Sequence, residues 1–88
     1  MNKTELIAKV AAATGMTKKD AGVAVNAVFS VITEALEEGT DVKIVGFGKF
    51  EIVKKEEKTQ LAFGKEVIVP AHNVVKFRPS DSLKNEIA

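Results

Sequence analysis

Few side chains in this sequence are suited to catalysis or metal binding. His72 is the only histidine and there is no cysteine, so a Cys nucleophile and a zinc site of several His or Cys ligands are excluded. Neither G-x-G-x-x-G nor G-x-x-x-x-G-K-[ST] occurs, which removes two common phosphate-binding loops. The acidic residues show no paired spacing that would favour carboxylate catalysis. We therefore expect no enzymatic activity, metal, cofactor or small-molecule substrate, and a structural or incidental role for His72.

The remaining chemistry lies in the lysines. Residues 1–42 hold four Lys against six acidic residues, whereas residues 43–88 hold nine Lys or Arg against six acidic residues. Such an excess indicates a polyanionic partner only where the fold gathers it on one surface. The run KKEEK (54–58) has two interpretations, a solvated strand with self-paired charges or a phosphate contact. Lysine is a point charge without a base-specific fork, so phosphate contact would be sequence-tolerant.

The elements that position these lysines begin with two predicted helices. Asn2 and Glu5 have the spacing of a capping box, and apolar residues follow at helical spacing until Gly15. A second helix is predicted from Thr17 until Gly39. It is apolar on more than one side and must be covered on more than one side. One short helix and a small sheet cover one side, so the other side indicates a second subunit.

From Asp41 the hydrophobic period changes to two, which predicts strands. Residues 45–50 predict a tight turn between the first two strands. Residues 50–70 predict a long hairpin, and nine or ten residues a side reach roughly 30 Å. A chain of 88 residues cannot bury such a hairpin, so it should project as an arm. A short strand over 74–77 and a final helix beginning near Ser80 or Asp81 complete the chain.

The predicted fold class is α+β, with two N-terminal helices, a three-stranded antiparallel sheet with a projecting β-hairpin arm and a short C-terminal helix. We expect one domain over 1–88, with a helical dimerisation part over about 1–40 and the sheet, arm and last helix over about 41–88. A monomer of this size buries only about 63% of its extended surface, which again favours a partner subunit. No apolar run approaches the roughly 18 residues that span a bilayer. The polar N-terminus is unlike a signal peptide, so we expect no membrane partner and a cytoplasmic location.

Seven segments in order along the whole chain carry a resemblance to a known family: MNKTELI (1–7), TGMTKKDA (14–21), VNAVF (25–29), VGFGKFE (45–51), VPA (69–71), FRP (77–79) and LK (83–84). They resemble the bacterial histone-like proteins, the family of HU and integration host factor. The resemblance implies an intertwined homodimer or heterodimer whose two β-arms embrace duplex DNA along the minor groove and bend it. The family's arm usually carries an Arg-Asn-Pro-type tip whose Pro wedges between base pairs. This chain has a shorter arm, with Thr59–Ala62 in place of that tip.

The resemblance also implies roles for particular positions. Leu61 or Phe63 is a candidate wedge in place of the missing Pro, because apolar wedges of several types unstack a base step. The alternative is that these two side chains pack on each other or on another molecule. The predicted DNA-binding residues that match basic positions of the family are Lys3, Lys55, Lys58, Arg78 and Lys84. Lys54, Lys65 and Lys76 are predicted to bind DNA from their position on or beside the same surface. The predicted dimer core contains Phe29, Phe47, Phe50 and Phe77.

The resulting function hypothesis is a dimeric, nucleoid-associated architectural protein. It would bind duplex DNA with little sequence specificity through the basic arms and the saddle between them, bending or compacting the DNA. The alternative is an HU-like scaffold with weak DNA binding that acts mainly through protein contacts at the arm tip. The net charge of only +1, and the dilution of the arm's charge by Glu56 and Glu57, motivate that alternative.

Overall fold

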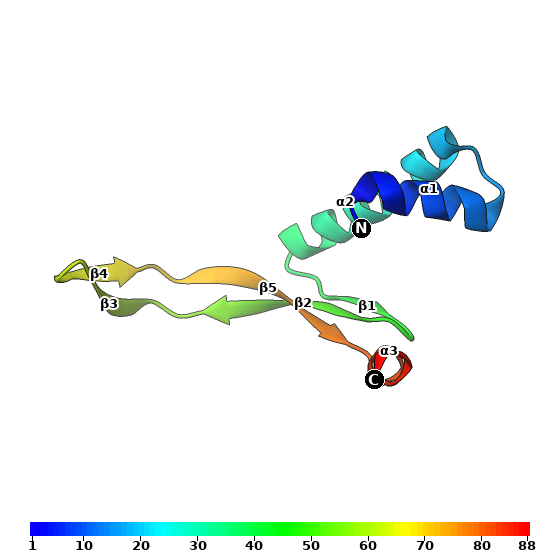
Figure 1. Cartoon of the computed structure of the whole chain (residues 1–88). Helices are drawn as coiled ribbons and strands as arrows, with labels where there is room; N and C mark the ends of the chain where they lie inside the picture. The colour runs from blue at the N-terminus through cyan, green and yellow to red at the C-terminus, as the bar shows by residue number, and fades with distance from the viewer. The chain divides into compact units, whose positions relative to one another are not determined.

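The computed structural model describes all 88 residues, which divide into two compact units, residues 1–34 and residues 35–88. Helix α2 begins in the first unit and ends in the second. The predicted α+β class and order of elements are confirmed. Along the chain the elements are α1 (Lys3–Thr14), α2 (Lys18–Glu37), β1 (Val42–Ile44), β2 (Gly48–Lys55), β3 (Lys58–Ala62), β4 (Lys65–Val69), β5 (His72–Pro79) and α3 (Asp81–Ile87) (Figure 1).

The helix ends lie where the capping residues predict them. The side chain of Asn2 accepts a hydrogen bond from the Glu5 backbone N–H at 2.9 Å, which satisfies a donor that the first turn of α1 leaves free. Gly15 ends α1 in the left-handed conformation, with φ of 75°. The Thr17 hydroxyl accepts a hydrogen bond from the N–H of Asp20 at 3.1 Å and begins α2 in the same way. These local interactions define where α1 begins and ends and where α2 begins.

The helical unit buries very little of its own apolar surface. Its buried side chains are small, since they are Ala11 on α1 and Ala21 and Val25 on α2. Large side chains on the rest of α2 stay exposed, among them Val31 at 63% and Phe29 at 45%. This confirms that α2 is apolar on more sides than its own chain covers, so the helix needs a further apolar partner.

The second unit is built on a three-stranded antiparallel sheet in the order β1-β2-β5. Phe50 on β2 lies opposite Val42 on one side and Phe77 on the other, and the rings of Phe50 and Phe77 are 4.9 Å apart. The Phe77 ring also covers Gly48, where a Cβ atom would lie 2.5 Å from it, so only glycine fits there. Alternation along the strands defines an apolar face, formed by Val42, Ile44, Phe50, Ile52, Val75 and Phe77.

The arm is a two-stranded ribbon that starts as β2 and β5 and continues as β3 and β4 (Figure 1). Its tip is the two-residue turn Phe63–Gly64, with φ of 53° and 74°, the signs that a type I′ hairpin turn requires. The tip therefore lies beyond Thr59–Ala62, which form most of β3 instead. The ribbon is interrupted at residues 56–57 and 70–71, so it is not one continuous hairpin over 50–70. Pro70 explains one side of the break, because proline has no N–H to donate to the ladder.

The last strand is longer than the sequence indicated. It runs over His72–Pro79 and not only 74–77, and it pairs with β2 along its whole length, from Gly48 opposite Pro79 to Lys55 opposite His72. The extra residues of β5 are held in the strand by pairing, because β2 provides a backbone hydrogen-bonding partner along its whole length. The alternation of apolar and polar residues in β5 is itself weak. A consequence is that both strands at the base of the arm have a fixed register, which decides which lysines share a face.

Candidate nucleic-acid interface

One face of the three-stranded sheet gathers most of its charged residues. Because successive side chains alternate between faces, the register places them opposite the apolar face defined above. The two valines of this side, Val53 and Val74, pair with each other. The charged face, as the term is used below, consists of Lys43, Lys49, Glu51, Lys55, His72, Lys76 and Arg78.

Three cations form a row across the charged face. Lys43 on β1 lies opposite Lys49 on β2, and Lys49 lies opposite Arg78 on β5. All three line a shallow hollow beside the β1–β2 turn. Like charges placed directly across strands destabilise a sheet unless an opposite charge lies near. The repulsion within the row must therefore be offset by nearby carboxylates or by an external anion.

Carboxylates within the chain partly supply that compensation. Lys49 Nζ lies 3.5 Å from Asp41 Oδ2 and 3.8 Å from Glu51 Oε2. Glu51 also accepts a hydrogen bond from the Arg78 guanidinium, and this bond, with its charge, raises the pKa of Arg78 above its already high value. The Glu51 side chain is only 16% exposed, whereas the Arg78 side chain is 69% exposed. Arg78 is thus anchored on one side and open to a second anion on the other.

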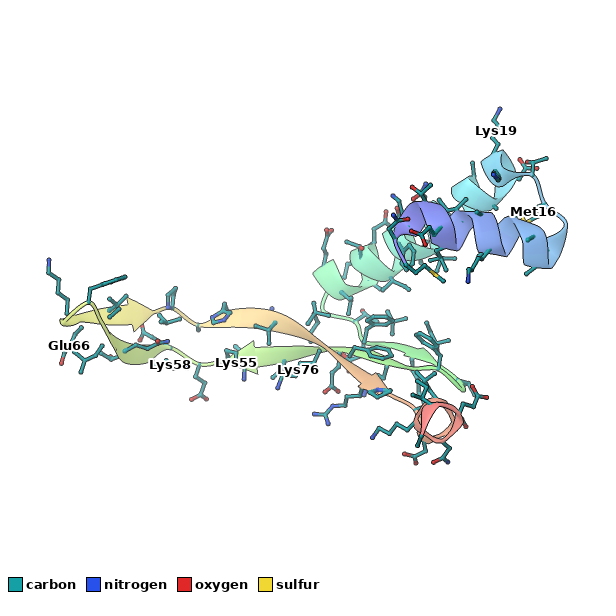
Figure 2. The ribbon with its side chains drawn as sticks, viewed as in Figure 1. Met16, Lys19, Lys55, Lys58, Glu66 and Lys76 are labelled. Atoms are coloured by element: carbon teal, nitrogen blue, oxygen red, sulfur yellow. The ribbon has the colours of Figure 1, made fainter.

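The arm extends the line of cations beyond the body of the sheet. Lys58, Lys55 and Lys76 follow one another from the arm towards the sheet in Figure 2. Lys55 and Lys58 border one hollow at the interruption of the ribbon, together with His72. Lys65, on β4 opposite Ala62, shares a face of the tip hairpin with Lys58. Four of these lysines therefore lie on the ribbon itself or at its base.

Three of the predicted DNA-binding residues lie elsewhere. Lys54 is on the apolar side of β2, opposite Asn73, because it is the neighbour of Lys55 in a strand. Lys3 is the first residue of α1 in the helical unit, and Lys84 is in the last turn of α3. A role for these three in DNA contact stays a prediction, as it does for Lys55, Lys58, Lys65, Lys76 and Arg78.

Sequence reasoning missed Lys43 and Lys49. Both belong to the cationic row, yet neither lies in a basic run, and each alternates with apolar residues. The signal that finds them is cross-strand register rather than composition. Once Arg78 is assigned to the charged face, its partner Lys49 follows, and Lys43 follows from Lys49.

The two candidate wedges occupy different positions on the tip hairpin. Leu61 lies on β3 opposite Glu66 and is 79% exposed. Phe63 is the first residue of the turn and is fully exposed. A non-glycine residue at positive φ costs roughly 1–2 kcal/mol. Because the Phe63 side chain is fully exposed, no packing within this chain offsets that cost. Of the two candidate wedges, Phe63 thus lies at the extreme tip of the arm and Leu61 on the strand that precedes the turn.

The four phenylalanines predicted for a dimer core also separate between the units. Phe47, Phe50 and Phe77 form one cluster in the sheet unit, with the Phe47 and Phe77 rings 5.5 Å apart. Phe29 lies on α2 in the helical unit.

The structure holds no group of three or more His, Asp or Glu residues suited to binding a metal ion. None of the helices is long and apolar enough to cross a membrane.

Comparisons with known proteins agree with this architecture. The family model described as bacterial DNA-binding protein matches residues 1–88. HU of Geobacillus stearothermophilus is 46% identical over 91 residues, covering 99% of each chain, and HU 1 of Bacillus subtilis is 41% identical over 90 residues, covering 100% and 98%. Among solved structures, an HU–DNA cocrystal from Anabaena superposes with a TM-score of 0.94 at 31% identity, covering 100% of this chain and 98% of the other. HU from Thermotoga maritima superposes with a TM-score of 0.74 at 36% identity, with both chains fully covered. The chain belongs to the HU family of bacterial DNA-binding proteins.

Proposed function

We propose that this chain forms a dimeric architectural protein that binds duplex DNA with little sequence specificity and bends or compacts it. The observation that carries the proposal is the series of cations on one face of the sheet. It runs from the row Lys43–Lys49–Arg78, through Lys76 and then Lys55 beyond the pair Val53–Val74, onto the arm. A duplex presents a dense array of phosphates, and a line of lysines along a ribbon neutralises such an array. Membership of a family of architectural DNA-binding proteins, and not of enzymes, agrees with this function.

Sequence tolerance follows from the residue types. Seven of the eight predicted contact residues are lysines, which bind phosphate as point charges and do not read base edges in fixed geometry. Arg78 has the planar fork for base reading, but one side of its guanidinium is occupied by Glu51. The protein would therefore recognise the shape and charge of the duplex, which suits a nucleoid-associated role in the cytoplasm.

The arm supplies the bending step in this proposal. Arms of this family bind along the minor groove, where apolar wedges unstack base steps and kink the duplex. No proline lies on the arm between Phe50 and Val69, so Phe63 at the turn takes the part of the wedge, with Leu61 as the second candidate. Wrapping by the lysines stabilises the bent duplex once the wedge has entered.

The test is fluorescence anisotropy on a labelled duplex of about 30 base pairs at several salt concentrations. A dimer doubles the eight predicted contact cations, and if half of them engage phosphate, log Kobs against log salt should have a slope of about −7. Changing both Lys55→Gln and Lys58→Gln should flatten that slope by roughly 3 to 4. The matched control is Lys9→Gln with Lys19→Gln, which removes the same charge from helical positions outside the predicted contact set.

Three outcomes are distinguishable. Tight binding with a steep slope that only the arm variant flattens supports the proposal. Equal flattening by both variants removes the arm from the mechanism and leaves a general charge effect. Very weak binding of the unmodified protein at low salt overturns the DNA-binding proposal and favours the scaffold hypothesis, whose protein partner would need Leu61 and Phe63.

A further inference from the structure

His72 lies where the arm leaves the sheet and belongs to the charged face. It is the first residue of β5, directly opposite Lys55 on β2, and it shares its side of β5 with Lys76 and Arg78. The hollow at the interruption of the ribbon is lined by Lys55, Glu56, Glu57, Lys58, Gln60 and His72, together with two valines. The His72 side chain is exposed, so its ring is accessible to a phosphate that binds beside Lys55 and Lys58.

A backbone contact fixes the orientation of the imidazole ring. His72 Nδ1 lies 2.9 Å from the carbonyl oxygen of Pro70, and since a carbonyl only accepts, Nδ1 carries the proton and donates it. Nε2 is then an acceptor in the neutral ring and a donor in the protonated ring. Only the protonated ring can therefore donate a hydrogen bond from Nε2 to a phosphate oxygen while keeping the contact to Pro70.

The hollow around His72 holds charges of both signs. Lys55 from β2 and Lys58 from β3 border the same hollow, so a protonated His72 adds a third positive charge beside them. Glu56 and Glu57, between those strands, also line the hollow and favour the added charge. A DNA phosphate entering beside the two lysines supplies further negative charge, and it adds an acceptor for Nε2–H. Binding of DNA and binding of a proton are then linked, each favouring the other.

We propose that His72 is a proton-dependent phosphate contact at the base of each arm, so that DNA affinity rises as pH falls through the range in which imidazole titrates. This inference rests on the proposed DNA-binding function and adds a residue that composition alone assigns no role. The effect has a definite sign. Below that range the contact is fully present, and it is lost as pH rises and the ring becomes neutral.

The experiment measures DNA affinity at pH 6 and pH 8 with the full-length protein, the same labelled duplex and several salt concentrations. With two histidines per dimer, the affinity of the unmodified protein should fall roughly tenfold from pH 6 to pH 8. The salt slope should also be steeper by up to about 2 at pH 6, because two more cations displace counterions. His72→Gln keeps a polar side chain of similar reach but no titratable proton, and it should bind with the same affinity and slope at both pH values.

The glutamine variant also controls for the α-amino group, the other group in the chain that ordinarily titrates near neutral pH. A pH effect present in the unmodified protein and absent from His72→Gln supports the proposal. Affinity independent of pH, or a pH effect that persists in full in His72→Gln, overturns it while leaving the DNA-binding function intact. Failure of the unmodified protein to bind DNA at either pH would instead overturn both, and the salt titration identifies that case.

Discussion

Glu51 is the residue that sets how strongly the charged face attracts an anion. It contacts both Arg78 and Lys49, and its side chain is only 16% exposed, so its charge is held close to theirs. If the proposed function holds, DNA phosphates compete with this carboxylate for the same two cations. In the free protein the carboxylate offsets repulsion between Lys43, Lys49 and Arg78.

Replacing this carboxylate should therefore strengthen DNA binding and weaken the fold. We expect Glu51→Gln to bind duplex DNA about three to ten times more tightly, since exposed ion pairs are each worth roughly 0.2–1 kcal/mol. The thermal midpoint of the free protein should fall at the same time. Anisotropy and thermal denaturation measure the two effects. Glu38→Gln changes the net charge equally at an exposed residue with no ion pair, and equal gains in affinity for both variants would contradict a local role for Glu51.

At the scale of elements, the helices were predictable and the arm only in part. Asn2, Gly15 and Thr17 cap the helices through residues close to them in the chain, so the sequence alone predicts where α1 begins and ends and where α2 begins. The interruption of the arm and the full length of β5 depend on pairing between strands distant in the chain. The candidate site also depends on strand pairing. Lys54 and Lys55 are both lysines in the same run, and only the register with β5 shows that they lie on opposite faces of the sheet.

The tip turn offers a direct test of the wedge. Phe63 has φ of 53°, a conformation that asparagine adopts more readily than phenylalanine. Phe63→Asn should therefore keep or raise the thermal midpoint while removing the ring. We expect DNA bending, measured by energy transfer between the ends of a duplex, to decrease, and affinity to fall about tenfold because base stacking is worth roughly 1–3 kcal/mol.

A matched change on the neighbouring strand identifies which side chain inserts. Leu61→Gln removes an exposed apolar side chain from the same hairpin without altering the turn. If Leu61→Gln abolishes bending and Phe63→Asn does not, the wedge is Leu61. Unchanged bending in both variants would show that lysine wrapping alone bends the duplex, and the arm tip would then have no part in the mechanism.

For the whole molecule, the apolar surface left uncovered in each unit is the strongest structural argument for a second copy of the chain. The helical unit leaves Phe29 and Val31 exposed, and the sheet unit leaves Phe77 at 41% and Phe47 at 46%. Side chains of this kind stabilise a protein when they leave water. Two copies of the chain would cover these surfaces mutually, as the family membership implies.

If dimerisation completes the core, folding must depend on protein concentration. We expect sedimentation equilibrium to give twice the 9.4 kDa mass of the chain. The thermal midpoint should rise by roughly 8 °C over a hundredfold increase in concentration, because two chains unfold as one unit. Phe29→Ser should lower both the midpoint and the apparent mass at low concentration, whereas Gln60→Ser, at an exposed polar residue of the arm, should change neither. A midpoint independent of concentration, together with the mass of one chain, would show that each chain folds alone, and a paired set of arms on one DNA duplex would then lose its structural basis.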